Sequence, residues 1–277
     1  MSKMINFICY GDYYLKVLDS LIDPIIKHLP ESTYQKTTKH QEGCLNISFF
    51  IESLPHRDVF MSHGIADKNW CNGQRVKDYD YVCVSGDAWK QKMLKQGVLE
   101  EKILVVGYTK LDPLFNDTQE FFKFEKTDKI RVLYAPTHNM SEDKKAITVS
   151  CYPRLDEYLS NIPEDIEILS SIHPANKDDR NTTFDLYKWC DVIVSDCSRT
   201  LYEALALDIP VVFPDWLVKK TIVEWYFNSF EYQIYTENIG YHAKNIKDFW
   251  DKIREANQNG LDKKTQDFIE GIFPSRL

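Results

Sequence analysis

Short apolar runs that alternate with helix-length segments are the feature that most limits how this chain can fold. In the first 115 residues, runs of strand length cover residues 4–10, 45–51, 59–62, 81–85 and 103–106. Periodic apolar residues over 15–26 and over 88–96 predict helices between these runs. Buried strands that alternate with helices are typical of a parallel sheet covered by helices.

The same alternation starts again in the second half of the chain. Strands are predicted at residues 130–135, 166–172, 192–195 and 211–213. Helices are predicted at residues 152–160, 183–189, 200–207 and 245–256. The stretch 116–129 between the two halves is polar and aromatic without a clear period. We therefore predict an α/β protein with two lobes, residues 1–115 and 130–277, joined by a linker.

Charge and cysteine content narrow the class of protein. The 277 residues include 34 basic and 42 acidic side chains, and the net charge of −8 argues against a nucleic-acid partner. The seven cysteines show no C-x-x-C spacing and lie mostly in or beside apolar runs, which favours a reducing compartment. The apolar stretch at the N-terminus is too short for a signal peptide, and no run approaches 18 apolar residues. We expect a cytoplasmic protein, with peripheral contact to the inner face of the membrane left open.

Polar segments follow several of the predicted strands, where parallel sheets bind ligands. His63, between Ser62 and Gly64, has a side chain that serves as a base near neutral pH, and the glycine lets the backbone approach a ligand. His173 ends another strand, and Pro174 holds it extended. Each segment taken alone also fits an ordinary loop.

The turn after the strand at 192–195 leads into a helix and has the composition of an anion site. Backbone N–H groups and the helix dipole favour a phosphate there, and Ser198, Arg199 and Thr200 add hydrogen-bond donors. In the alternative interpretation, Thr200 and Glu203 form a capping box for their own helix. Glu203 also suits a contact with ribose hydroxyls.

Three further features carry weaker signals. Thr137, at the exit of the strand 130–135, suits a base or phosphate contact but also an ordinary strand end. The aromatic residues near Asp215 and in 225–227 suit either an acceptor or the core. Asp178 and Asp179 fit a solvated loop better than a metal site, so we predict no metal site.

Taken together and in this order, these segments resemble the CDP-glycerol glycerophosphotransferase family, the teichoic-acid primases and polymerases. The family has a histidine-glycine-threonine stretch followed by a lysine, and then a glycine-tyrosine/serine-proline-arginine-x-asparagine/aspartate stretch. A tyrosine-alanine-proline-threonine stretch, a histidine-proline pair, an aspartate-tyrosine-serine-serine helix start and a lysine-proline-hydrophobic strand follow. The segments that match the family's motifs are residues 62–68, 107–112, 134–137, 173–174, 195–199 and 209–213.

The resemblance implies a GT-B-like fold, in which two Rossmann-type lobes flank a cleft and the C-terminal lobe holds the donor. It also implies that the last helix, residues 263–271, packs back on the first lobe. The implied reaction moves an alditol phosphate from a CDP-linked donor to a hydroxyl of a glycan or lipid-linked acceptor in cell-surface polymer synthesis, without a metal ion. His63 would be the base and His173 would hydrogen-bond the diphosphate. The residues assigned to the donor site are Gly64, Lys68, Thr137, Ser195, Asp196, Ser198, Arg199, Thr200 and Glu203.

Three of the departures from the family pattern bear on the chemistry of the site. Ile65 stands in place of the threonine, Arg199 in place of the second serine, and His138 in place of an aromatic residue. Because hydroxyl groups are missing around the expected phosphates, the donor stays open. The alternatives are a GT-B glycosyltransferase that uses a UDP-sugar, a UDP-sugar epimerase, and a binding module without activity, against which the intact His63 and His173 argue.

Overall fold

The chain forms two compact units in the computed structural model. The structure describes residues 3–9, 11–51, 57–69, 73–115, 127–139, 141, 143, 146–173, 176 and 183–273. Unit 1 comprises Met1–Ile65, Trp70–Gln119 and Glu270–Leu277. Unit 2 comprises Ala66–Asn69 and Glu120–Ile269. Of the predicted linker 116–129, residues 116–126 lie outside the described residues.

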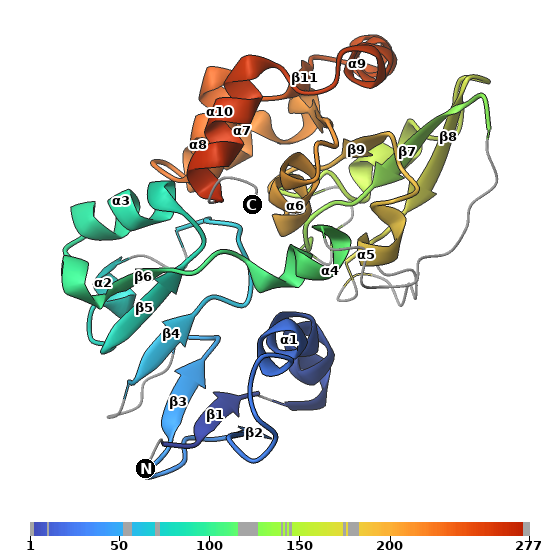
Figure 1. Ribbon diagram of the computed structural model, residues 1–277. Coiled ribbons are helices and arrows are strands. Elements are labelled where there is room, and N and C mark those ends of the chain that lie inside the picture. The colour runs from blue at the N-terminus through green and yellow to red at the C-terminus, as the bar shows by residue number, and fades with distance from the viewer. Residues whose placement is uncertain are drawn as a thin grey trace. The chain divides into compact units, whose positions relative to one another are not determined.

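Unit 1 contains a six-stranded parallel sheet with the order β2-β1-β3-β4-β5-β6 (Figure 1). Its strands are β1 (Ile5–Ile8), β2 (Tyr34–Thr37), β3 (Leu45–Ser48), β4 (Val59–Met61), β5 (Tyr81–Val84) and β6 (Ile103–Val105). Its helices are α1 (Gly11–Ile26), α2 (Gly73–Val76), α3 (Asp87–Lys95) and α4 (Asp112–Phe115), with 3₁₀ turns η1 (Glu100–Lys102) and η2 (Thr109–Leu111).

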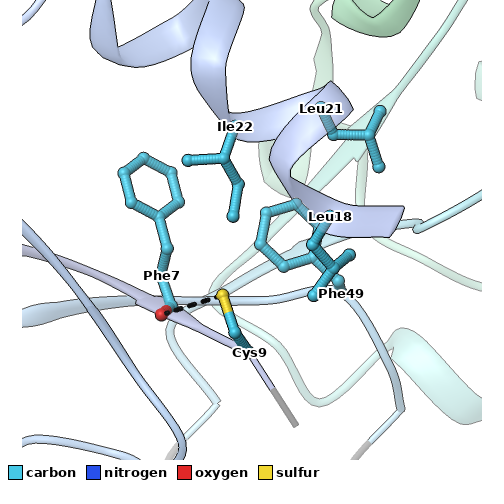
Figure 2. Packing of buried hydrophobic residues seen from close by; sticks show 6 residues of the cluster. All are labelled: Phe7, Cys9, Leu18, Leu21, Ile22 and Phe49. Atoms are coloured by element: carbon cyan, nitrogen blue, oxygen red, sulfur yellow. Dashed lines mark hydrogen bonds between the residues drawn. The ribbon is translucent and has the colours of Figure 1, made fainter. Parts of the chain in front are cut away.

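The core of unit 1 forms where α1 packs on the first strands of the sheet. Leu18, Leu21 and Ile22 are spaced three and four residues apart, so they share one face of the helix. They pack against Phe7 of β1 and against Phe49, and all five side chains are buried (Figure 2). Within the periodic apolar stretch seen in the sequence, Leu18, Leu21 and Ile22 therefore form a buried face of α1.

Unit 2 contains a five-stranded parallel sheet with the order β11-β10-β9-β7-β8. Its strands are β7 (Ile130–Tyr134), β8 (Ile166–Ser170), β9 (Val192–Val194), β10 (Val211–Pro214) and β11 (Tyr241–Ala243). Its helical segments are η3 (Arg154–Glu157), α5 (Thr183–Leu186), α6 (Arg199–Ala206), α7 (Asp215–Trp225), α8 (Phe230–Glu237), α9 (Ile246–Asn259) and α10 (Lys263–Ile272). The strands β9 and β10 are buried along their whole length, which explains why they form unbroken apolar runs in the sequence.

The predicted strands are confirmed in both halves, but the helix predicted at 152–160 is wrong. The described structure has only the 3₁₀ turn Arg154–Glu157 there. Hydrogen bonds that a helix would not make hold this segment: the Arg154 guanidinium donates to the nearby carbonyl oxygens of Thr148 and Ser150, and the N–H of Cys151 donates to the distant Asp196. Together these bonds outweigh the local helical pattern.

The end of α10 packs within unit 1. The Ser85 hydroxyl, after β5, donates to the carbonyl oxygen of Ile272 over 2.7 Å. The next residue is Gly86, at which a Cβ atom would collide with the backbone of Ile272. A glycine is therefore required where the end of this helix meets the turn between β5 and α3.

Candidate functional site

Three neighbouring strands of unit 2 bring most of the predicted donor-site residues to one edge of the sheet. The strands β9, β7 and β8 are adjacent and parallel, so their carboxyl ends meet at the same edge. Thr137 follows β7, His173 follows β8, and the turn that begins at Ser195 follows β9. This edge of an open parallel sheet is where ligands bind.

Ser195 and Asp196 are buried, and their side chains form hydrogen bonds with the protein backbone. The Ser195 hydroxyl is buried and donates to the carbonyl oxygen of Ala135 over 2.8 Å. The carboxylate of Asp196 is fully buried and accepts from the N–H groups of Thr137, Cys151 and Cys197 over 2.8, 2.9 and 2.6 Å. Burial raises the pKa of Asp196, and these hydrogen bonds oppose the rise. Asp196 therefore ties two loops to the start of α6.

The start of α6 differs from the predicted capping box. Ser198, and not Thr200, is the N-cap residue, and its side-chain oxygen accepts from the N–H of Thr200 over 3.2 Å. Glu203 instead accepts from the buried hydroxyl of Tyr187 over 2.5 Å. Burial and the charge of Glu203 raise the pKa of Tyr187 well above its ordinary value, so the phenol keeps its proton and donates. The capping-box interpretation is therefore wrong.

Basic side chains gather at the same edge of the sheet. We use the name basic cluster for Lys68, His138, His173 and Arg199, which are all half-buried. The rings of His138 and His173 stack with their centroids 5.2 Å apart, and the Lys68 ammonium donates to the Thr137 hydroxyl over 2.6 Å. Arg199 is the first residue of α6, so its guanidinium adds to the positive end of that helix.

Electrostatics in the basic cluster suit an anion. Burial, followed in order by the neighbouring His138, Arg199 and Lys68, lowers the pKa of His173 from 6.5 to about 4. At neutral pH His173 is therefore uncharged beside two permanent positive charges. A site that disfavours one more positive charge is one in which an anion is stabilised.

His63 lies in unit 1, in the turn that follows β4. Its Nδ1 lies 3.2 Å from the carbonyl oxygen of Phe49, and its ring stacks on Phe50 with centroids 4.2 Å apart. Because a carbonyl oxygen only accepts, Nδ1 carries the proton, and in the neutral ring Nε2 carries the lone pair. A ring fixed in this way is suited to act as a base through Nε2.

A pocket that the sequence did not predict lies at the carboxyl edge of the sheet in unit 1. Among the residues that line it are Met61, Gly64, Cys83, Val106 and Tyr108. Two of its hydroxyl groups bind to the backbone: Ser62 donates to the carbonyl oxygen of Gly64, and Thr109 donates to that of Leu21. Burial raises the pKa of Cys83 to about 11, so its thiol stays protonated and behaves as an apolar group.

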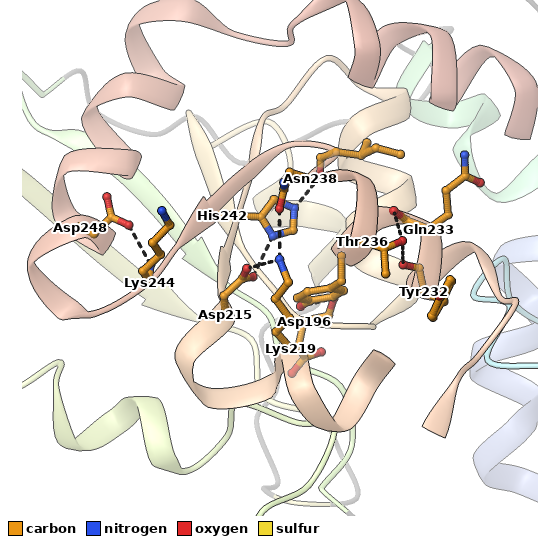
Figure 3. A network of polar contacts seen from close by, with 12 residues as sticks. Asp196, Asp215, Lys219, Tyr232, Gln233, Thr236, Asn238, His242, Lys244 and Asp248 are labelled. Carbon is orange, nitrogen blue, oxygen red and sulfur yellow. Dashed lines mark hydrogen bonds and ion pairs between the residues drawn. The ribbon is translucent and has the colours of Figure 1, made fainter. Parts of the chain in front are cut away.

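Asp215, which the sequence left as either an acceptor contact or a core residue, belongs to a polar network in unit 2. Its carboxylate contacts Nδ1 of His242 at 2.7 Å and the ammonium of Lys219 at 3.1 Å. Lys219 also donates to Asn238 (Figure 3). The contacts join the start of α7 to β11, and they give Asp215 a structural role.

The described residues offer no candidate for a metal centre or for a membrane span. They contain no group of three or more His, Cys, Asp or Glu side chains arranged to hold a metal ion. Asp178 and Asp179 lie outside the described residues. None of the described helices has the length and hydropathy needed to cross a lipid bilayer.

Sequence reasoning missed the side chains that fix this site. His138 departs from a family motif in the sequence, but its stacking on His173 is visible only in the structure. Tyr187 gave no signal, because its partner Glu203 lies 16 residues away in the chain. The same holds for Glu231, which accepts from the N–H groups of Asp67 and Lys68 across more than 160 residues.

Neither a family model nor a curated protein matches the sequence of this chain. Solved structures do match its fold. A structure of a variant of the wall teichoic acid polymerase TagF superposes with a TM-score of 0.58 at 15% identity, over 98% of this chain and 82% of the other. Another TagF variant, soaked with CDPG, superposes with a TM-score of 0.52 at 16% identity, over 97% and 88%.

The fold also matches that of epimerases. A putative UDP-N-acetylglucosamine 2-epimerase from Listeria monocytogenes superposes with a TM-score of 0.54 at 13% identity, over 97% of this chain and 91% of the other. At these identities the comparisons establish the fold. The chain has the two-lobed α/β architecture of the GT-B type, and its resemblance to the teichoic-acid polymerases is confirmed at the level of the fold.

Proposed function

We propose that this protein is a transferase that moves an alditol phosphate, such as glycerol phosphate, from a CDP-linked donor to a hydroxyl group of an acceptor. The observation that carries the proposal is the basic cluster at the start of α6, on the sheet edge where such folds bind ligands. Support for a diphosphate comes from the two cationic side chains, the two stacked imidazoles and the helix N-terminus that the cluster brings together.

Three side chains hold the diphosphate in this proposal. Lys68 and Arg199 make charge-assisted hydrogen bonds to phosphate oxygens, which are about twice as strong as neutral ones. His173 is neutral in the free protein and gains a proton more easily once the negative ligand is bound. The cluster then stabilises the negative charge that collects on the departing CMP, usually the largest contribution to catalysis of this kind.

The other predicted donor-site residues fall into two groups: those that we assign to the ligand, and those that are buried and bind to the protein itself. Thr137 lies against the Lys68 ammonium, and Ser198 and Thr200 lie at the N-terminus of α6, where the helix dipole favours an anion. Gly64 has no side chain to block the backbone of its turn. The buried residues that we assign to shaping the site, through bonds to the protein, are Ser195, Asp196 and Glu203.

His63 is the proposed base. Its Nε2 takes the proton of the acceptor hydroxyl as the oxygen attacks the phosphorus that bears the alditol. The new bond joins the acceptor oxygen to that phosphorus, and the bond to the bridging oxygen breaks, so that this oxygen leaves on CMP. The apolar pocket beside Gly64 keeps water away from this part of unit 1.

A second candidate function uses a UDP-sugar. The fold match to a UDP-N-acetylglucosamine 2-epimerase favours it, since the basic cluster would hold any nucleoside diphosphate. A glycosyltransferase would release UDP, and an epimerase would return a UDP-sugar with one centre inverted. The two candidates and the main proposal therefore differ in their nucleotide products.

The test is product analysis with each donor. The protein is incubated with CDP-glycerol or with UDP-N-acetylglucosamine, with and without glycan and lipid-linked acceptors, and nucleotides are separated by chromatography. EDTA is present throughout, because the proposal requires no metal ion. We expect CMP, formed only from CDP-glycerol and only with an acceptor. Release of UDP, or an epimerised UDP-sugar without CMP, would assign the second function.

The proposed acceptor is a growing cell-surface polymer or its lipid-linked precursor. With such an acceptor, the proposed location is the cytoplasm, where peripheral contact with the inner face of the membrane would bring the protein to its acceptor. Fractionation of cells that express the protein, with and without a high-salt wash, tests that placement.

A further inference from the structure

Residues 66–69 follow the turn that contains His63, yet they belong to unit 2. Two consecutive residues in this segment have left-handed backbone conformations, with φ of +42° at Lys68 and +58° at Asn69. Side chains other than glycine rarely adopt such angles, and they persist only where the surrounding structure fixes them. Something in unit 2 therefore holds this segment in place.

The carboxylate of Glu231, in the first turn of α8, accepts two of the hydrogen bonds that fix this segment. One oxygen accepts from the N–H of Asp67 and the other from the N–H of Lys68, each over 2.8 Å. The Tyr202 hydroxyl, from α6, donates to the first of these oxygens over 2.7 Å. Glu231 is fully buried, so its two oxygens are directed at the protein and not at solvent.

The carboxylate of Asp67 also accepts hydrogen bonds from backbone N–H groups. One of its oxygens accepts from the N–H of Phe230, at the start of α8, over 2.8 Å, and the other accepts from the N–H of Asn69 over 3.2 Å. The Asn69 amide also donates to the carbonyl oxygen of Phe227. We call Asp67, Tyr202 and Glu231 the clamp. Hydrogen bonds to buried carboxylates are among the stronger ones in proteins, so the clamp fixes the backbone of Lys68 firmly.

The clamp matters because Lys68 has a flexible side chain. Its ammonium reaches the Thr137 hydroxyl over 2.6 Å, and its charge is one of those that lower the pKa of His173. Burial and the charge of Glu231 raise the pKa of Tyr202 well above its ordinary value, so the phenol stays protonated and remains a donor. A fixed backbone reduces the number of positions that the ammonium can sample.

We propose that Glu231 is a positioning residue for the donor site: through the backbone of residues 67 and 68 it holds the Lys68 ammonium at the diphosphate subsite. The inference rests on the function proposed above. The lysine is supplied by a segment that belongs to unit 2, so the subsite is complete within that unit before any ligand binds.

The first test needs no ligand. Lysines of the wild type and of Glu231→Gln are acetylated with a limiting reagent, and the rates are read by mass spectrometry relative to the exposed Lys220. The glutamine keeps the size of the side chain but can accept from only one of the two N–H groups through its single carbonyl oxygen. We expect Lys68 to react several-fold faster in the variant. The matched control is Glu237→Gln, an exposed residue of the same helix, which should leave the rate unchanged.

The second test measures binding of inorganic pyrophosphate, the part that all candidate donors share. Glu231→Gln should weaken binding about tenfold, and the same substitution should have almost no further effect in Lys68→Met, because its effect passes through that lysine. A residue with a general structural role would weaken binding equally in both backgrounds. Tyr202→Phe, which removes one hydrogen bond and keeps the ring, should move both measurements in the same direction by less.

The outcomes separate the two proposals. An unchanged acetylation rate of Lys68 in both Glu231→Gln and Tyr202→Phe overturns the positioning role, whatever the protein binds. Faster acetylation with equal losses of pyrophosphate affinity in both backgrounds overturns it as well. If the wild type binds pyrophosphate but makes none of the expected nucleotide products, the proposed function is wrong and the positioning role of Glu231 is unaffected.

Discussion

The carboxyl edges of the two sheets carry different side chains. In unit 1 the turn after β4 places His63 between a backbone carbonyl group and the ring of Phe50, and an apolar pocket lies beside Gly64. In unit 2 the corresponding edge carries the four side chains of the basic cluster and the start of α6. The first edge suits a single proton transfer, and the second suits an anion with two negative charges.

The comparison also shows what hydroxyl groups do at such edges. In both units the serines of the turns bind to the backbone: Ser62 to Gly64, Ser195 to Ala135, and Ser198 to Thr200. They shape the turns, and charged or aromatic side chains are left to meet a ligand. The predictions below test this division between the two edges, beginning with the largest expected effect.

Replacement of His63 by alanine should lower the rate of transfer by about 10²–10⁴-fold, the usual range for loss of a general base. Donor affinity should stay within about twofold, since the charged side chains assigned to the diphosphate lie in the other unit. Initial rates of CMP release and donor titrations measure the two effects. His28→Ala, at an exposed position, is the control. A His63→Ala variant with a near-normal rate would move the base elsewhere.

Arg199→Ser restores the serine of the family pattern and removes one cation from the basic cluster. Donor affinity should fall by about tenfold or more, because hydrogen bonds to charged groups contribute about 1.5–3 kcal/mol. Isothermal titration with CDP-glycerol measures it. Arg254→Ser removes an arginine whose partner is the exposed Asp165, and it should leave the affinity unchanged. Equal affinities of Arg199→Ser and the wild type would show that this guanidinium points away from the donor.

Donor affinity should rise as the pH is lowered from 8 towards 5. The pKa of His173 is about 4 in the free protein, and a bound diphosphate raises it, so binding takes up a proton. The diphosphate diester of a CDP-linked donor does not itself titrate in this range. Titrations at several pH values should show the trend, and His173→Gln should remove it. Affinity that does not change with pH in the wild type would separate His173 from the ligand.

The free energy of unfolding of the protein without ligand should decrease as the pH is lowered, whereas donor affinity should increase. Between pH 6.5 and about 4 the unfolded chain protonates this histidine, whereas the folded chain does not. The free energy of unfolding therefore decreases as the pH falls through this interval, and the contribution of His173 is fully present above it. Denaturant unfolding of the wild type and of His173→Gln gives the difference.

Ser198→Ala should have the smallest effect on binding. Loss of the N-cap side chain should lower the free energy of unfolding by about 1 kcal/mol, while donor affinity changes by less than about threefold. Asn245→Ala removes the corresponding N-cap of α9 and should cost a similar amount of stability. Urea unfolding and donor titration measure both. A large loss of affinity with unchanged stability would instead assign the Ser198 hydroxyl to a phosphate.

Much of the fold was predictable because buried parallel strands produce apolar runs with few other interpretations. The strands β9 and β10 are buried along their length and were identified from the sequence. The strand β2 was missed because its sequence, Tyr-Gln-Lys-Thr, is polar and only partly buried at the edge of the sheet. The helices α7 and α8 were missed because their many aromatic residues obscure a helical period.

Less of the site was predictable, because direction and partner decide a side chain's role. The sequence places Asp196 at a strand end, but only the tertiary structure shows that its carboxylate turns inward to bind Thr137 and Cys151. Lys68 was assigned to the donor site from a motif alone. Glu231 holds the backbone of Lys68 through a contact between residues 163 positions apart. The sequence offers no local pattern for such a contact.

The most direct test of the account is a thermal-shift panel of the wild-type protein with CDP-glycerol, CDP-ribitol, UDP-N-acetylglucosamine and UDP-glucose. A ligand at about 100 times its dissociation constant should add roughly 2.7 kcal/mol to the free energy of unfolding. We expect clear stabilisation by the CDP-linked compounds and less by the UDP-sugars. Stabilisation by UDP-sugars alone would contradict the proposed donor, and no stabilisation by any of the four would contradict the assignment of the basic cluster as a nucleoside diphosphate site.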